Sequence, residues 1–306
     1  MTEVDAIQDQ AFPCRAVRVI DPFGAGGGPD IIGRAIAERL SEMWGQRVIV
    51  ENHPGAGSTA APALVAKALA DGYTLLINTS AHAYSAAFSS GLSYDPLVDF
   101  VPVAALTSQP YVLVAGAQSG ITSVHQLISA AEASPGKLRF ASAGTGTGTH
   151  VAVEKVNRDL RITAVHAPPG AAEFMSDVIA GTAAGRTVYA MSPISFAAPH
   201  LADGGLVALG VSTLRRSQLL PDIPSLAEVG VTDFDFPIWY GIWAPARTSS
   251  AIVGKLAGDI ATVLAAPELL DWLLRHDAEP MCMTQAEFAA FVVSESERAA
   301  FLLSSG

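Results

Sequence analysis

The sequence predicts an α/β protein of two lobes, in which a glycine-rich loop from each lobe faces a shared ligand cleft. Three observations lead to this prediction. The chain has 306 residues, enough for two domains. Short apolar strands alternate with amphipathic helices along most of its length, a pattern typical of βαβ units in a parallel sheet. Two glycine-rich segments, 22–30 and 141–150, each join an expected strand to an expected helix, about one small domain's length apart.

The composition narrows the class of protein. The formal net charge is −11, which argues against a nucleic-acid partner because such proteins need a basic face. Apolar residues make up 50% of the chain and charged residues 15%, as in globular proteins with large buried faces. No apolar run reaches the roughly 18 residues of a membrane span. Cys14 and Cys282 form no metal-binding spacing, and the sequence gives no reason to expect a metal.

The first βαβ unit is the clearest. It consists of a strand at 15–20, a helix at about 29–44 and a strand at 47–50. Pro29 suits the first helical position, and Gly45 suits the position after the last helical residue. The helix carries apolar residues at helical spacing, namely Ile32, Ile36, Leu40, Met43 and Trp44.

The alternation continues through the chain. Further strands are expected at 73–78, 111–115, 138–141, 162–166 and 206–211. Further helices are expected at 59–69, 123–133, 150–160, 172–179, 250–265, 267–276 and 285–303. The chain is expected to cross between lobes near Thr107 and to return near 226–235. Lobe 1 then comprises 1–107 with 229–306, and lobe 2 comprises 108–228.

The first glycine-rich loop has the features of an anion site. Consecutive glycines allow a tight turn and leave no Cβ between the backbone and a ligand. The helix that follows directs free N–H groups and its positive dipole end toward the same space, which suits a carboxylate or phosphate. The alternative is a tight turn that binds nothing. The candidate ligand-binding residues here are Phe23, Gly24, Ala25, Gly26 and Gly27.

A dinucleotide cofactor fits this loop poorly. Gly24, Gly26 and Gly28 follow a strand, and Glu51 ends the next strand, where a ribose-binding acid would stand. The motif requires a third Gly or Ala where this chain has Pro29. The spacing therefore argues against a nicotinamide or flavin cofactor.

Two further polar segments follow expected strands. The second glycine-rich loop adds hydroxyl groups that can donate to carboxylate oxygens, although one Thr could simply cap the next helix. Its candidate residues are Ser142, Gly144, Thr145, Gly146, Thr147 and His150. The third polar segment, 78–84, is expected to be a loop and contributes Asn78, Thr79, Ser80 and His82.

Signals for catalysis are weak. The chain lacks the GxSxG, GxxxxGK[ST] and HExxH motifs. Three of its seven His residues, His82, His150 and His166, follow expected strands or loops and could converge on a cleft, although a structural role is more frequent for any single His. The aromatic run at 239–243 is expected to be core.

Several motifs in a fixed order resemble the Bug/TctC family, the extracytoplasmic solute receptors of tripartite tricarboxylate transporters. The matching segments are 19–30, 50–57, 71–76, 94–100, 143–150, 220–230 and 239–245, and the resemblance runs from residue 12 to the C-terminus. It implies a two-lobed periplasmic-binding-protein-like fold that closes on a small organic acid. It also implies that loops at 23–28, 78–82 and 143–150 surround the ligand, that no cofactor is needed, and that the ligand passes to a membrane permease.

The chain departs from the family pattern at several places. Asp21 stands where the family usually has an apolar residue. Segment 167–170 lacks a Tyr and a Lys of the family, segment 181–188 is longer and lacks an Asp, and Ser192 replaces an acidic or amide residue and joins the candidates. The first ten residues are polar and acidic rather than an export signal, so the sequence as written is expected to be cytoplasmic unless a signal was removed, whereas the family is periplasmic.

Two main functions remain open from the sequence, with a cytoplasmic sensor or partner protein as a third and lesser alternative. The first is a solute-binding protein for a carboxylate ligand, with a possible permease partner. The second is a cytoplasmic isomerase, lyase or hydrolase of an organic acid on the same scaffold. In that enzyme Asp21 or a His (82, 150 or 166) would be the general base, and loop amides would stabilise negative charge. The oligomeric state and the identity of the acid are not predicted.

Overall fold

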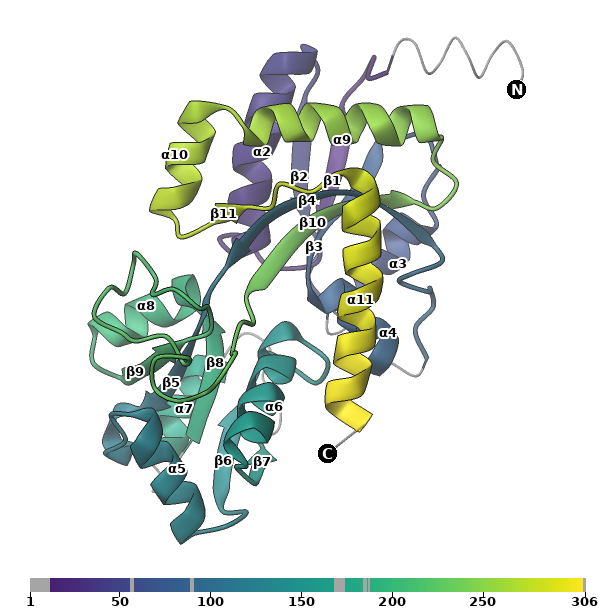
Figure 1. Cartoon of the computed structure of the whole chain (residues 1–306). Helices are drawn as coiled ribbons and strands as arrows, with labels where there is room; N and C mark the ends of the chain where they lie inside the picture. Colours follow the sequence, from purple (N-terminus) through teal and green to yellow (C-terminus); the bar gives the residue numbers. More distant parts are fainter. Residues whose placement is uncertain are drawn as a thin grey trace. The chain divides into compact units, whose positions relative to one another are not determined.

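Two mixed β-sheets, each with its own helices, organise the chain (Figure 1). The computed structural model describes residues 12–55, 58–88, 91–167, 174–183, 186 and 188–304. Unit 1 consists of Met1–Ser108, Trp239–Leu274 and Ala278–Glu297, and unit 2 of Gln109–Ile238, Arg275–Asp277 and Arg298–Gly306. The predicted α/β class is confirmed.

The sheet of unit 1 has the order β11-β4-β10-β3-β1-β2. Its strands are β1 (Val17–Asp21), β2 (Val48–Asn52), β3 (Thr74–Thr79), β4 (Phe100–Gln109), β10 (Ile238–Pro245) and β11 (Glu279–Pro280). The prediction of a parallel sheet holds for β1 with β2 and β3, but β10 lies antiparallel to β3. The sheet is therefore mixed, because β10 comes from the C-terminal third of the chain instead of a βαβ crossover.

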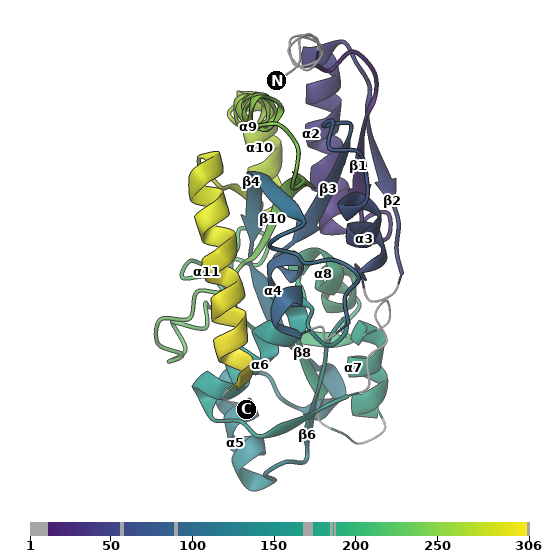
Figure 2. The ribbon, with the colours of Figure 1, turned by 90° about the vertical axis from the view of Figure 1, so that its right-hand side faces the viewer.

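The helices of unit 1 include α2, which follows the first predicted loop. They are α2 (Gly28–Trp44), α3 (Ala60–Ala66), α4 (Ala81–Phe88), α9 (Ser250–Leu264), α10 (Pro267–Arg275) and α11 (Gln285–Ser304). As predicted, Pro29 lies in the first turn of α2, and Gly45 ends the helix in the left-handed conformation. Helix α3 lies against β1 and β3, and α11 lies beside α4 (Figure 2).

The core of unit 1 is aromatic where β10 meets α11. Trp239 and Trp243 are fully buried and pack against Phe288. The run at 239–243 is thus core, as predicted. Glu295 on α11 accepts hydrogen bonds from the Tyr84 hydroxyl and the Trp239 indole. These bonds satisfy a buried carboxylate and fasten α11 to α4 and β10.

Unit 2 has a second sheet, of order β7-β6-β8-β5-β9. Its strands are β5 (Tyr111–Gly116), β6 (Leu138–Ala141), β7 (Ala164–His166), β8 (Val188–Pro193) and β9 (Leu206–Val211). Its helices are α5 (Val124–Ala133), α6 (Gly148–Leu160), α7 (Phe174–Ala183) and α8 (Ile194–Ala202), with a short 3-10 turn, η2 (Ala117–Ser119). Strand β6 is parallel to β7 and β8, whereas β5 is antiparallel to β8 and β9. The sheet is again mixed.

Some elements differ from the sequence prediction. Strands β6 and β9 have the predicted bounds, but β4, β8, β10 and α8 were not predicted. The segment 78–84, expected to be a loop, enters helix α4 at Ala81. The atypical segments 167–170 and 181–188 fall partly outside the described residues, at 168–170, 184–185 and 187.

Among the described residues, no single helix has the length and apolar character needed to cross a membrane. Helices α9 and α10 would meet that test only together, and they are bent by 72°.

Candidate functional site

The loop between β1 and α2 is held in place by two carboxylates. The amide of Phe23 donates to Asp21 Oδ1 at 2.9 Å, and the amide of Gly26 donates to Asp30 Oδ2 at 2.9 Å. Gly26 has a positive φ of 82°, which glycine adopts without strain. The amide of Gly27 donates to Gly24 O at 3.3 Å. The sequence prediction treated all these amides as free for a ligand, and three of them are instead occupied by the protein.

Two consecutive amides at the tip of this loop are different. Within the described residues, the amide N–H groups of Gly24 and Ala25 have no hydrogen-bond acceptor. Both precede the N-terminus of α2, whose dipole favours a negative charge. No atom of the described residues would lie within 4 Å of a Cβ at Gly24, so these residues leave the backbone there open. The tip of the loop therefore keeps the features of an anion site.

Gly28, the first residue of α2, is required for a different reason. A Cβ at this position would overlap the hydroxyl of Tyr240 on β10. Tyr240 is buried, and its burial together with the nearby Asp21 raises its pKa well above the ordinary value. The close contact places the start of α2 directly against β10.

Asp21, predicted as a possible base, is fully buried beneath the loop. It is paired in register with Asn52 on the parallel strand β2, and Asn52 Nδ2 lies 3.1 Å from Asp21 Oδ2. Burial raises the pKa of Asp21 to about 7, opposed by the hydrogen bond from the Phe23 amide. Burial also acts on Asp30, but hydrogen bonds from Arg34, Gly26 and Asn52 outweigh it and lower the pKa of Asp30.

The polar residues at the end of β3 are buried and mostly bonded to the chain itself. Asn78 Oδ1 accepts from the Thr79 amide at 2.8 Å, and Thr79 Oγ1 accepts from the Ala81 amide at 3.1 Å. The Ser80 amide donates to Trp239 O, while the Ser80 hydroxyl has no partner among the described residues. These contacts build the turn into α4, so a ligand role for this segment stays a prediction.

His82 belongs to the aromatic core of unit 1. Its ring centroid lies 4.7 Å from that of Phe100, 4.8 Å from that of Trp243 and 6.3 Å from that of Tyr94. The ring is 1% exposed, and burial lowers its pKa to about 3. Because the imidazole is enclosed by other rings, the geometry disfavours the predicted role of His82 as a ligand contact or base.

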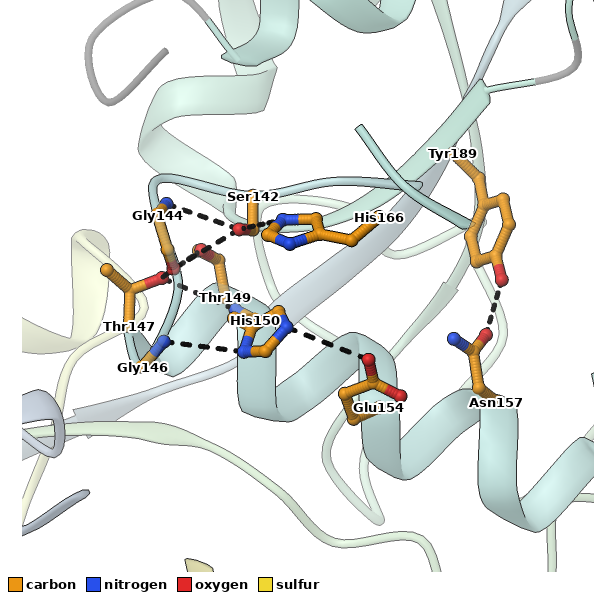
Figure 3. A network of polar contacts seen from close by, with 10 residues as sticks. All are labelled: Ser142, Gly144, Gly146, Thr147, Thr149, His150, Glu154, Asn157, His166 and Tyr189. Carbon is orange, nitrogen blue, oxygen red and sulfur yellow. Dashed lines mark hydrogen bonds and ion pairs between the residues drawn. The ribbon is translucent and has the colours of Figure 1, made fainter. Parts of the chain in front are cut away.

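In unit 2, side chains accept hydrogen bonds from three amides of the loop between β6 and α6, and Figure 3 draws two of these bonds, at Gly144 and Gly146. The Gly144 amide donates to Ser142 Oγ at 3.2 Å, and the Gly146 amide donates to His150 Nδ1 at 3.4 Å. Thr147 Oγ1 accepts from the His150 amide at 3.4 Å, which is the helix-capping role considered for one Thr. Thr149 Oγ1 accepts from the Ala143 amide at 2.9 Å. Among the described residues, Thr145 has no hydrogen-bond partner for its amide or its hydroxyl.

His150 and His166 do converge, as predicted. Their ring centroids lie 4.6 Å apart, and both rings stack on Phe140, which pairs in register with His166. His166 Nε2 lies 2.8 Å from Ser142 Oγ, and His150 Nε2 lies 3.6 Å from Glu154 Oε1 (Figure 3). Burial, with the adjacent His166, lowers the pKa of His150 to about 4, and burial also lowers the pKa of His166. Both imidazoles are therefore uncharged at neutral pH.

Ser192, the remaining candidate, ends strand β8 and is fully buried. Its hydroxyl donates to Pro193 O at 3.0 Å.

The sequence prediction missed two residues that contact side chains of the glycine-rich loops. Asn52 contacts Asp21 and Asp30, and Glu154 contacts His150. Asn52 could have been found as a polar residue at the end of a strand beside β1, whereas Glu154 needed the helical register of α6. No cluster of His, Cys, Asp or Glu in the described part of the chain could hold a metal ion.

Comparison with known proteins gives one consistent result. The family described as "Tripartite tricarboxylate transporter family receptor" (TctC) matches residues 32–305. The UPF0065 protein in the tcbD-tcbE intergenic region of Pseudomonas sp. (strain P51) is 34% identical over 290 residues, which cover 94% of this chain and 85% of that protein.

Solved structures agree. R. palustris Rpa4515 with adipate matches with a TM-score of 0.86 and 29% identity, over 96% of this chain and 97% of that one. MatC (Rpa3494) from Rhodopseudomonas palustris, with bound malate, matches with a TM-score of 0.82 and 29% identity, over 95% of this chain and 99% of that one.

Proposed function

The chain belongs to the tripartite tricarboxylate transporter receptor family (TctC), and we propose that it is a solute-binding protein for a small organic acid. The observation that carries this proposal is a pair of adjacent amides, Gly24 and Ala25, that have no acceptor among the described residues and lie on a loop that two carboxylates hold in place. Such a loop can bind a carboxylate without rearranging, because its other amides are already bonded.

The chemical class of the ligand follows from the relatives and the loop together. The structural relatives hold adipate and malate, both dicarboxylates. In this chain the loop after β1 offers backbone donors at a helix N-terminus, and Thr145 in unit 2 offers a hydroxyl and an amide. We therefore place a ligand carboxylate at Gly24 and Ala25 of unit 1, and we name Thr145 and His166 as the candidate ligand contacts of unit 2 taken by itself.

The enzyme alternative receives no support from the comparisons, and the geometry disfavours its bases. Asp21 is fully enclosed beneath the loop, and His82 is enclosed in the aromatic core. His150 has both ring nitrogens facing groups of its own helix or loop. We further propose that, as in the family, this protein acts outside the cytoplasm and delivers its organic acid to a membrane permease.

A carboxylate screen tests the proposed function. Adipate, malate and benzoate are added in turn, and the melting temperature is measured. We expect at least one acid to raise it and, in an amide NMR spectrum, to shift the signals of Gly24 and Ala25. The acid is then recovered from the incubation and checked by NMR. Recovery of the unchanged acid is expected, whereas conversion would favour the enzyme alternative. Binding that leaves both amide signals in place would contradict the assigned site.

A further inference from the structure

The side-chain amide nitrogen of Asn52 lies within hydrogen-bond distance of three oxygen atoms beneath the loop after β1. Asn52 Nδ2 lies 3.0 Å from Asp30 Oδ1, 3.1 Å from Asp21 Oδ2 and 3.2 Å from Phe23 O. An amide nitrogen carries two hydrogens, so three acceptors compete for two donors. With both carboxylates ionised, the cluster lacks one hydrogen.

The charges around the cluster are unevenly distributed. On α2, Arg34 Nε donates to Asp30 Oδ1 at 2.8 Å, and Arg34 Nη2 donates to Asn52 Oδ1 at 2.9 Å. Arg34 thus forms an ion pair with Asp30. Asp21 has no ion pair among the described residues, although it is the more deeply buried of the two carboxylates. Its negative charge is therefore the poorly compensated one.

Among the residues that the structure describes, the other elements packed on Asp21 bring no second cation to it. On β2, Glu51 is bonded to Arg18, and His53 reaches Asp21 only by donating its backbone N–H to the Asp21 carbonyl. On β3, the neighbouring strand, the strand-end residue Asn78 is uncharged. On β10, the facing group is the Tyr240 hydroxyl, whose raised pKa keeps it neutral.

We propose that Asp21 is a proton-binding site of this receptor and that the loop binds its carboxylate preferentially when Asp21 Oδ2 carries a proton. This inference rests on the proposed function. Asp21 Oδ1 holds the Phe23 amide, which directly precedes the Gly24 and Ala25 amides. An anion at those amides approaches a buried like charge, and like charges repel strongly where water is excluded. A proton on Oδ2 removes this charge and supplies the missing hydrogen.

The direction of the coupling follows from linkage. The ligand favours the protonated form of Asp21, so the affinity for a carboxylate is highest at low pH and declines as Asp21 ionises. Because burial raises the pKa of Asp21 to about 7, the change falls in the neutral range. If a bound anion raises this pKa by about one unit, the affinity decreases about sixfold between about pH 6.5 and about pH 8.5.

The first test needs no ligand. The carboxyl carbon of Asp21 is followed by 13C NMR across the pH range and is assigned with the Asp21→Asn variant. We expect it to titrate near neutral pH, with the Phe23, Gly24 and Ala25 amide signals shifting at the same midpoint. Titration of Asp21 in the ordinary range of about pH 4 would overturn the proposal. The proposal would also be overturned if the amide signals of Phe23, Gly24 and Ala25 did not shift as Asp21 titrates.

The second test uses adipate and malate as probes, with calorimetric affinities at about pH 6.5 and about pH 8.5 corrected for protonation of the acids. Wild type should lose affinity about sixfold at the higher pH, and Asp21→Asn should lose none. The matched control is Asp222→Asn, which removes an exposed carboxylate outside the cluster and should keep the pH dependence.

The outcomes separate the two proposals. Equal wild-type affinities at both pH values would overturn the proton site but leave the receptor function standing. Failure of both acids to bind wild type at either pH would count against the proposed function for these acids, and the ligand-free titration would still decide the proton site.

Discussion

Ser142 Oγ lies 2.8 Å from Nε2 of His166, so one hydrogen bond joins the residue after β6 to the last residue of β7. The same hydroxyl oxygen accepts the Gly144 amide at 3.2 Å. A single side chain therefore fixes both the start of the second glycine-rich loop and the orientation of an uncharged imidazole beside it.

Replacement of Ser142 by Ala is expected to weaken the second loop. The change leaves the half-buried Gly144 amide and a half-buried His166 ring nitrogen without their partner and should lower the free energy of unfolding by about 1 kcal/mol. The affinity for a carboxylate should fall as well, because His166 loses its orienting partner. Denaturant unfolding and calorimetry check the two effects. Ser129→Ala, on the exposed side of α5, is the matched control and should change neither. An unchanged affinity in Ser142→Ala would contradict a role for this end of the loop.

Two glycines of the first loop should respond to Ala in opposite ways. Gly28→Ala places a methyl group onto the Tyr240 hydroxyl and should destabilise the fold by about 1–3 kcal/mol. Gly24→Ala meets no atom within 4 Å, so the melting temperature should stay close to that of wild type while carboxylate affinity declines. The comparison of melting temperature with affinity separates packing from binding. Equal loss of stability in both variants would mean that Gly24 serves packing alone.

The sequence predicted those elements whose ends are marked by residues next to them in the chain. Helix α2 could be predicted because Pro29 and Gly45 mark its ends, and β6 and β9 because short apolar runs lie between turn residues. Strand β10 could not, since an apolar aromatic run fits a buried helix as well as a strand. Strand β10 pairs antiparallel with β3, which lies far from it in the sequence, so no local sequence pattern predicts this pairing.

The same limit applies to the candidate site. The glycine-rich loops were visible in the sequence, but the state of each amide depends on side chains several residues or a whole strand away. Asp30 captures the Gly26 amide, and His150 captures the Gly146 amide. The burial of His82 depends on rings from β4 and β10. Only the tertiary structure distinguishes the unbonded pair Gly24 and Ala25 from its neighbours.

Acid should destabilise unit 2 through His150. Burial and His166 lower the pKa of His150 to about 4, whereas the unfolded chain protonates this His at about 6.5. The unfolded state then binds more protons between these values, so stability falls as the pH decreases through this window. The contribution is about 2 kcal/mol between pH 7 and pH 5. Thermal unfolding of His150→Gln should show less acid sensitivity than wild type, and His125→Gln, on the exposed side of α5, should match wild type. If His150→Gln retains the full sensitivity, another group is responsible.

Asp21 should destabilise the fold as the pH rises, opposite to an ion-paired carboxylate. Its pKa is about 7 in the folded protein and about 3.9 in the unfolded chain, so the native state binds the extra proton between these values. Stability is lost as the pH rises through this window, by up to about 4 kcal/mol above pH 7. Asp21→Asn carries no such penalty, so its melting temperature relative to wild type should increase steadily from about pH 4.5 to about pH 8.

Asp30→Asn provides the opposite control for this measurement. The pKa of Asp30 is lowered, so its ionised form stabilises the fold above the unfolded pKa, and the variant should be less stable than wild type at neutral pH. The two substitutions make the same chemical change at carboxylates that share one Asn52 amide, so only the difference in charge compensation separates them. A melting temperature for Asp21→Asn that runs parallel to wild type at every pH would show that Asp21 is already ionised at acidic pH.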